Sequence, residues 1–119
     1  MSSISSFKDL IVWQRAMELT KEVYQITEAL PKSEIYALSS QMRRSAISIP
    51  SNIADGSKRG TVKDYSQFLK ISQGSAAELE TQLLLLSSIY VNINIQKSLD
   101  LLEEVQKMLT IIIKRLNGK

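Results

Sequence analysis

Apolar residues recur along this chain at alternating intervals of four and three, the spacing that places side chains on one face of an α-helix. The pattern occurs in four segments, which we expect to be helices over residues 9–30, 33–59, 62–90 and 95–117. The connections between them are short, and short connections make consecutive helices run antiparallel. The sequence therefore predicts an all-α, antiparallel up-down-up-down four-helix bundle, with residues 1–119 forming a single domain.

The apolar stripe of each predicted helix is expected to face a common core. The stripe of the first helix is Val12, Ala16, Leu19, Val23, Ile26 and Leu30. The stripe of the second helix is Ile35, Leu38, Met42, Ala46, Ile49 and Ile53. The stripe of the third helix is Tyr65, Leu69, Ser72, Ala76, Leu79, Leu83, Leu86 and Tyr90.

Proline, glycine and threonine mark the ends of these helices. Pro31 disfavours the helical conformation in the residue before it, so the first helix should end at Leu30. Pro50 removes one backbone donor within the second helix, and we expect a kink there because the apolar stripe resumes beyond it. Gly60 is a candidate C-cap, and Thr61 is a candidate N-cap for the third helix.

The fourth predicted helix has more apolar surface than one core requires. One stripe consists of Leu99, Leu102, Leu109, Ile113 and Leu116, and a second consists of Leu101, Val105, Met108 and Ile112. In the third helix, the run from Leu83 to Leu86 points in every direction around the axis. Such surface favours self-association, so we expect a homo-oligomer; the alternative is a broad core in a monomer.

Composition removes most catalytic chemistries. The chain contains neither cysteine nor histidine, which excludes thiolate nucleophiles, Ser-His pairs and the usual zinc sites. Glu78 and Glu80 lie two residues apart on a helix and cannot face each other. We therefore expect no enzyme activity, no catalytic residues, no metal and no cofactor. With neither a signal peptide nor a span of about 20 apolar residues, the chain is expected to be cytoplasmic, without membrane contact.

Several polar residues fall on sides of the helices where a bundle would favour apolar ones. Counting equal distances from the Gly60 turn puts Arg43 at the level of Glu78, so Arg43 or Arg44 could pair with Glu78. Asn52 and Asp55 could satisfy the backbone groups freed by Pro50. In the alternative interpretation, this polar side lines a ligand or protein contact.

Up-down connectivity gathers basic residues at one end of the bundle. The candidate nucleic-acid-binding residues at this end are Lys8, Lys58, Arg59, Lys63, Lys114, Arg115 and Lys119, which outnumber Asp9, Asp55 and Asp64. Such an end attracts phosphate backbones at low salt, although a solvated helix end without a partner is an equally open interpretation. We expect no aromatic side chain at this end to stack on bases, so binding should depend on shape and charge rather than on base sequence.

Long gap-free segments of this sequence resemble a known family. They are FKDLIVWQ at residues 7–14, QMRRSAISIPSNIADGSKRG at 41–60 and DYSQFLKISQGSAAELETQL at 64–83. These segments resemble the four-helix bundle proteins encoded within 23S ribosomal RNA intervening sequences. The resemblance implies an up-down bundle that assembles into a homopentameric ring, in a family largely without assigned function.

The resemblance also implies a set of characteristic polar positions and two kinds of partner. The polar positions are Arg43, Arg44, Asn52, Asp55, Arg59, Tyr65, Ser75 and Glu78, with aspartate at residue 55 where the family pattern has glutamate. A related group, the accessory protein of diversity-generating retroelements, works with a reverse transcriptase and nucleic acid. Two functions follow as expectations: a non-catalytic oligomer that binds RNA or DNA, or a scaffold that presents a ring to a protein such as a reverse transcriptase.

Overall fold

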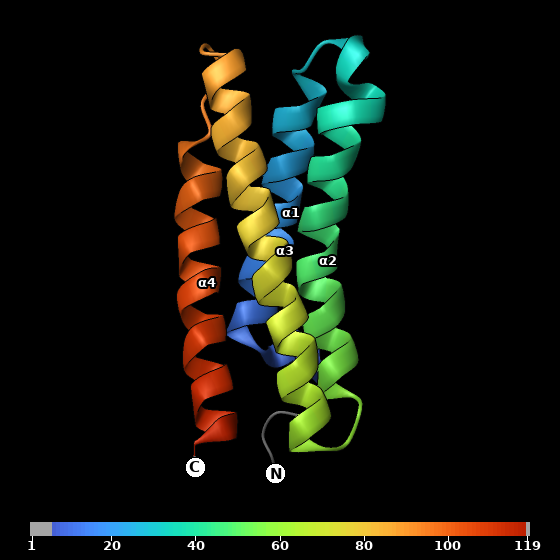
Figure 1. The fold of residues 1–119 in the computed structure, drawn as a ribbon, viewed down its shortest axis with the longest axis vertical. Helices are drawn as coiled ribbons and strands as arrows, with labels where there is room; N and C mark the ends of the chain where they lie inside the picture. Colours follow the sequence, from blue (N-terminus) through green and yellow to red (C-terminus); the bar gives the residue numbers. More distant parts are fainter. Residues whose placement is uncertain (1–5, 119) are drawn as a thin grey trace.

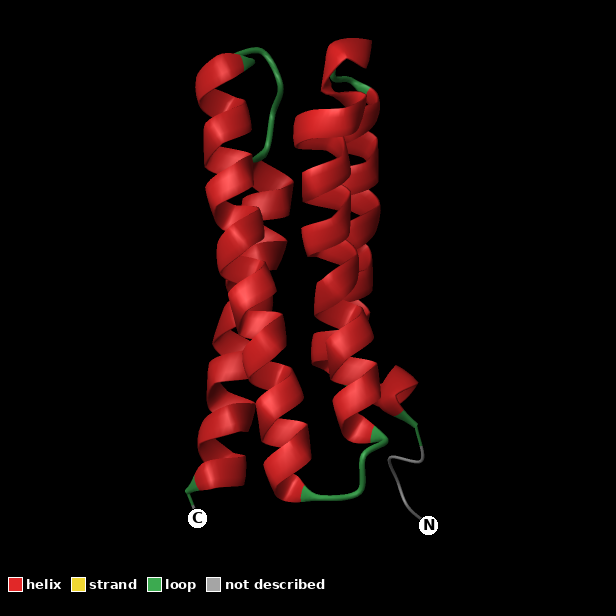
Figure 2. Cartoon of the chain, turned by 45° about the vertical axis from the view of Figure 1, so that its right-hand side comes forward, coloured by secondary structure: helices red, strands yellow, loops and turns green. Residues whose placement is uncertain are grey.

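Four long helices make up the fold, which a computed structural model describes for residues 6–118. They are α1 (Ile11–Glu28), α2 (Ser40–Ser57), α3 (Val62–Ile89) and α4 (Gln96–Asn117). The helices lie side by side and alternate in direction (Figures 1 and 2). Each helix contacts the next in sequence, and α1 also contacts α4, which closes the bundle. The predicted all-α four-helix architecture is confirmed, and residues 6–118 contain no strand.

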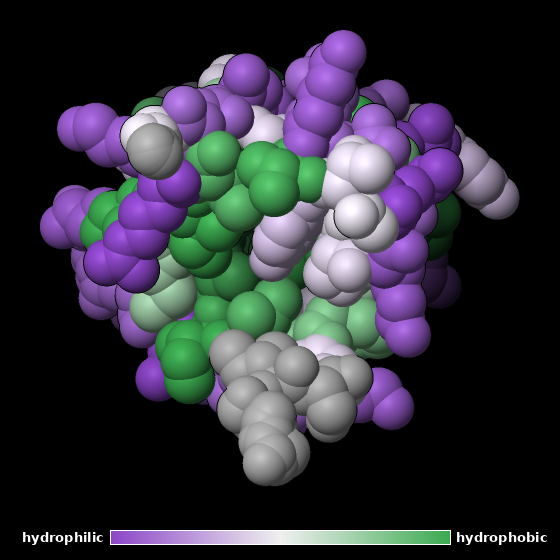
Figure 3. All heavy atoms as spheres, turned by 90° about the horizontal axis from the view of Figure 1, so that it is seen from below, coloured by the Kyte–Doolittle hydropathy of each residue, from purple (hydrophilic) through white to green (hydrophobic). Residues whose placement is uncertain are grey.

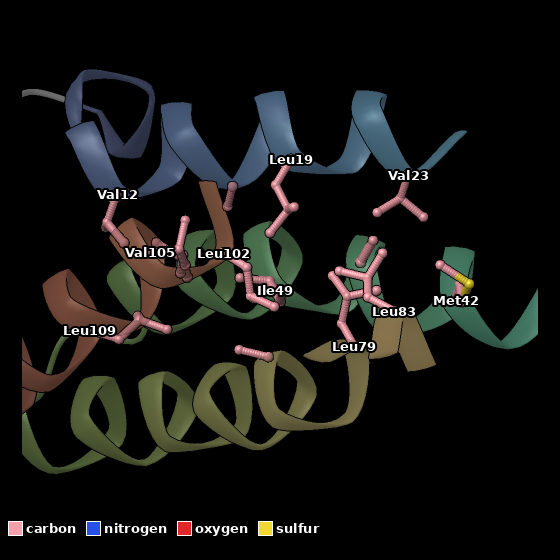
Figure 4. Packing of buried hydrophobic residues seen from close by; sticks show 14 of the residues in the cluster. Val12, Leu19, Val23, Met42, Ile49, Leu79, Leu83, Leu102, Val105 and Leu109 are labelled. Carbon is pink, nitrogen blue, oxygen red and sulfur yellow. The ribbon is translucent and has the colours of Figure 1, made fainter. Parts of the chain in front are cut away.

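The predicted apolar stripes form most of the core between the helices (Figure 4). All six residues of the first predicted stripe are buried. In the third stripe, the six residues from Leu69 to Leu86 are also buried: Leu69, Ser72, Ala76, Leu79, Leu83 and Leu86. In α4, Leu102, Val105, Leu109 and Ile113 are buried. Of the second predicted stripe of α4, Val105 is buried, whereas Leu101, Met108 and Ile112 are partly buried and pack against the core, so part of their apolar surface stays exposed.

The connection between α1 and α2 differs from the sequence prediction. The predicted helix over 33–59 begins as a 3₁₀ turn (Lys32–Glu34) and a π-helical turn (Ile35–Ser39), and α2 starts only at Ser40. Ala37 has the non-helical dihedral angles φ −126° and ψ −106°. A π turn holds an extra residue per turn, so it rotates Ile35 away from the stripe of α2. Ile35 is consequently 48% exposed rather than part of the core.

Pro50 lies within α2, and the helix continues on both sides of it, as the resumption of the stripe predicted. The proline ring cannot donate the hydrogen bond that the Ala46 carbonyl would otherwise accept. The hydroxyl Oγ1 of Thr20 in α1 lies 3.2 Å from that carbonyl oxygen and 2.8 Å from the Ala16 carbonyl oxygen of its own helix, so its single hydrogen is shared between the two acceptors. A hydroxyl of a neighbouring helix is thus the contact to the freed carbonyl, whereas Asn52 Nδ2 donates to the Ser48 carbonyl at 2.8 Å and Asp55 pairs with Arg59.

The turn between α2 and α3 follows the sequence prediction closely. Gly60 has a φ of +93°, a backbone conformation that glycine adopts readily and that residues with a Cβ atom rarely adopt. The side chain of Thr61 accepts a hydrogen bond of 3.1 Å from the backbone N–H of Asp64, as an N-cap does. This tight turn fixes α2 and α3 as an antiparallel pair.

Candidate nucleic-acid interface

The start of α1, the α2–α3 turn and the end of α4 meet at one end of the bundle (Figure 1). We call this the basic end, defined by the exposed residues Lys8, Lys58, Arg59, Lys63, Lys114 and Arg115. Lys119, the seventh predicted residue, lies outside the described residues. The carboxylates of Asp9, Asp55 and Asp64 are exposed at the same end. The topology therefore brings six of the predicted basic residues together with half as many acidic ones.

Arg59 differs from the other cations of the basic end because its guanidinium is already engaged. Its Nε and Nη2 donate to the two carboxylate oxygens of Asp55 at 3.1 and 3.2 Å. The guanidinium also lies 4.5 Å from the ring centre of Phe68. Between residues 6 and 118, no carboxylate lies within ion-pair distance of the other five basic side chains. Those five are the charges available to an anionic partner.

Viewed end-on, the basic end is not uniformly polar. In Figure 3, hydrophilic side chains form a rim, and hydrophobic side chains fill a hollow near its centre. The rings of Phe7 and Trp13 meet edge to face at 5.3 Å near the start of α1. Phe7 directly precedes Lys8, and Phe68 lies beneath the guanidinium of Arg59, so aromatic residues do stand beside basic ones here, contrary to our expectation.

The expected pairing of Arg43 with Glu78 is wrong. The Nε atom of Arg43 donates to Thr27 Oγ1 at 2.8 Å, and its guanidinium lies 4.3 Å from the ring centre of Tyr24. Both partners belong to α1, whereas Glu78 is exposed on α3. Within the described chain, neither Arg43 nor the exposed Arg44 forms an ion pair with Glu78. Counting from the turn predicted the level of Arg43 along the bundle axis but not the direction in which it points.

The remaining polar positions fall into separate contacts. The hydroxyls of Ser48 and Ser75 lie 2.7 Å apart between α2 and α3, and Asn52 Nδ2 donates to Ser48 Oγ at 3.0 Å. Among the described residues, the ion-pair partner of Asp55 is Arg59. Tyr65 is half-buried, and this burial raises the pKa of its phenol. The family's polar positions therefore form several local contacts rather than one converging site.

Two contacts that the sequence did not predict join distant helices. Arg15 Nε in α1 donates to Glu104 Oε2 in α4 at 2.9 Å, a contact that raises the pKa of Arg15 further above its ordinary value. At the end opposite the basic end, the Tyr90 hydroxyl donates to Glu34 Oε2 at 2.5 Å. This hydrogen bond, together with partial burial and the charge of Glu34, raises the pKa of Tyr90. Either contact could have been predicted only after the neighbouring helices and their facing sides were known.

The described part of the chain contains neither a cluster of metal ligands nor a membrane-spanning helix. Its acidic side chains include no group of three or more that could hold a metal ion. None of its helices combines the length and apolar character needed to cross a membrane.

Comparisons with known proteins identify relatives of this bundle. The family model described as 23S rRNA-intervening sequence protein matches residues 8–111. A solved structure of a protein with unknown function from the S23 ribosomal protein family of Bacteroides thetaiotaomicron is similar, with a TM-score of 0.63. The two chains are 22% identical, and the match covers 89% of this chain and 94% of that one. No curated protein matches the sequence.

Proposed function

This chain belongs to the 23S rRNA-intervening sequence protein family, and from that starting point we propose that it is a non-catalytic, self-associating protein that binds nucleic-acid backbones through its basic end. The observation that carries the proposal is a group of five exposed cations that have no ion-pair partner within residues 6–118: Lys8, Lys58, Lys63, Lys114 and Arg115. Unpaired lysines and arginines gain most from phosphates because they release the counterions condensed on the nucleic acid.

Self-association strengthens this proposal because it multiplies a modest charge. The chain carries a net charge of only +3 at pH 7. In a ring, several basic ends would face the same strand, and linked weak contacts bind more tightly than separate ones. Exposed leucines on α3 support an association surface: Leu84 is 53% exposed and Leu85 is 50% exposed. A homopentameric ring, the assembly that the family resemblance implies, is the form we propose.

Binding of RNA across a salt series tests the nucleic-acid proposal. We expect the logarithm of the association constant to fall linearly with the logarithm of the salt concentration, by roughly 0.9 per neutralised phosphate on a duplex. Exchanging Lys58, Lys63 and Lys114 for glutamine should weaken binding and flatten the slope. The matched control exchanges Lys21, Lys70 and Lys97, three exposed lysines elsewhere on the bundle, for glutamine.

The contrary outcomes are distinct. An absence of RNA and DNA binding by the wild-type protein at low salt would exclude a nucleic-acid function. An equal loss of affinity in the control variant would mean that overall charge, rather than the basic end, attracts the nucleic acid.

The second candidate function is a protein-interaction scaffold, and the exposed leucines of α3 favour it. In this case the surface of Leu84 and Leu85 contacts a different protein, such as a reverse transcriptase. Affinity capture after nuclease treatment would then recover one partner in a fixed ratio, and exchange of both leucines for glutamine would abolish its recovery.

A further inference from the structure

A cleft lies at the end of the bundle opposite the basic end, between the last turn of α1 and the irregular start of the α2 segment. Its volume is about 430 Å³. We call it the α1–α2 cleft, and its lining residues are Thr27, Glu28, Leu30, Lys32, Ile35, Ser39, Ser40 and Arg43. The volume is within the range of small-molecule sites, and the lining combines two cations with three hydroxyl groups.

Arg43 is held rigidly at the wall of this cleft. Its Nε–H donates to Thr27 Oγ1 at 2.8 Å, and the ring of Tyr24 lies beneath the guanidinium. The contacts of Nη2 are long, with Tyr24 O at 3.5 Å and Glu28 Oε2 at 3.7 Å. The guanidinium is thus oriented by one strong hydrogen bond, while its outer N–H groups lack short acceptors among the described residues. A guanidinium held in this way can donate two parallel N–H···O hydrogen bonds to a phosphate group.

Tyr36 is an exposed aromatic residue in the segment that lines the cleft. It follows the lining residue Ile35 in the π-helical turn and is 95% exposed. The non-helical backbone of the next residue, Ala37, breaks the regular helix at this point. A tyrosine so exposed contributes little to the core of its own chain. It is instead available for stacking on an unpaired base.

We propose that the α1–α2 cleft is a site for single-stranded nucleic acid, in which Arg43 and Lys32 bind a phosphate and Tyr36 stacks on an adjacent base. The inference rests on the proposed function and deepens it. The basic end supplies backbone attraction, whereas this cleft selects strands whose bases are accessible. Glu28 opposes the phosphate, but its side chain is 79% exposed and can turn toward solvent.

The test measures binding of a short single-stranded RNA and of a blunt RNA duplex with the same composition. We expect Tyr36→Ala to weaken single-strand binding about tenfold and to leave duplex binding unchanged, because paired bases cannot reach the ring. Tyr36→Phe should bind like the wild type, and Glu28→Gln should bind the single strand more tightly. The control is Val91→Ala, the loss of an exposed apolar side chain in the other connection at this end of the bundle.

Arg43→Lys is a second test variant. It keeps the positive charge but removes the planar guanidinium group that can donate two parallel hydrogen bonds. We expect weaker single-strand binding with an unchanged circular dichroism spectrum. Nuclear magnetic resonance separates the two parts of the site. Inorganic phosphate should shift the signals of Arg43 and Lys32 but not those of Tyr36, and a nucleoside 5′-monophosphate should shift the signals of all three residues.

The outcomes separate this inference from the proposed function. If the lysine variants of the basic end lose RNA binding while Tyr36→Ala and Arg43→Lys keep it, the cleft proposal is wrong and the proposed function stands. If the wild-type protein binds neither RNA at low salt, both fail. A change of molecular mass or of protein capture in Tyr36→Ala, without any effect on single-strand binding, would reassign the tyrosine to a protein contact and overturn the proposal.

Discussion

Gly56 leaves no room for a side chain between α2 and α3. A Cβ atom at this position would lie 2.7 Å from Phe68 Cβ and 3.2 Å from Tyr65 Cδ1. Because Phe68 Cβ is attached directly to the backbone of α3, the clash can be relieved only by moving the two helices apart.

We therefore expect Gly56→Ala to lower the free energy of unfolding by about 1–3 kcal/mol. Gly74→Ala is the matched control, since a Cβ there meets no atom within 4 Å and alanine favours a helix by about 0.5–1 kcal/mol. Urea unfolding of the two variants should give changes of opposite sign. Stabilisation by both would show that the helices are free to separate at Gly56.

Thr20 compensates in part for the missing backbone donor at Pro50. Replacing Thr20 with valine keeps the shape of the side chain but removes the hydroxyl that lies near the Ala46 carbonyl, so we expect a loss of about 1 kcal/mol in thermal or urea unfolding. The control is Thr81→Val, because the Thr81 hydroxyl bonds only the carbonyl of Ala77 on the exposed side of α3. Equal effects would argue against a special role for Thr20.

The Tyr90 hydroxyl makes the stability of the fold depend on alkaline pH. The raised pKa of Tyr90 means that the folded protein holds this proton above about pH 10, where an unfolded tyrosine releases it. The contribution is therefore complete below about pH 10 and is lost as the pH rises through the folded-state pKa. Burial of Tyr65 acts in the same direction.

We expect Tyr90→Phe to lose less stability than the wild type between about pH 9 and the folded-state pKa, because it lacks this proton. Urea unfolding at several pH values in this range measures the difference. Parallel curves for the two proteins would show that the Tyr90–Glu34 hydrogen bond does not persist in solution.

At the scale of the elements, the regular helices were predictable and the irregular connection was not. The bounds of α3, Val62–Ile89, differ by a single residue from the predicted 62–90, because Thr61 and the alternating apolar spacing leave little choice. The π-helical turn at Ile35–Ser39 has no comparable signal. Its backbone depends on tertiary contacts such as that of Glu34, which accepts hydrogen bonds from both Leu38 N and Tyr90.

The candidate site likewise has one part that was predictable from the sequence and one part that was not. The basic end follows from connectivity alone, so its residues could be predicted from the sequence before any contact was known. The direction of Arg43 could not, because the sequence shows only that a polar residue stands at that level. Which neighbouring helix it faces depends on the rotation of α2 about its own axis.

The exposed face of α3 carries the element-scale prediction. Leu84 and Leu85 lie on the surface, while Leu83 and Leu86 on either side of them are fully buried. Exchanging Leu84 and Leu85 for glutamine should therefore reduce the molecular mass measured by light scattering without unfolding the helices. The control exchanges Ile47, an exposed residue of α2, for glutamine. An unchanged mass in the double variant would place the association surface elsewhere.

For the whole molecule, the proposed ring makes stability depend on protein concentration. Subunits that bind one another in the folded state stabilise it by mass action, so the melting temperature should rise as the protein is concentrated. Scanning calorimetry over a wide concentration range measures this rise. A melting temperature that does not change with concentration would mean that the bundle is stable as a single chain.

The closed seam between α1 and α4 also has a consequence for the order of folding. The α2–α3 pair is joined by a tight turn, whereas the Arg15–Glu104 contact spans 89 residues of chain. Bringing distant segments together costs more chain entropy, so we expect the α2–α3 hairpin to form in the transition state and the seam to close afterwards. Leu69→Ala should then mainly slow folding, and Val12→Ala should mainly speed unfolding. By this route α1, although it precedes α2 and α3 in the chain, would dock only after those two helices have paired.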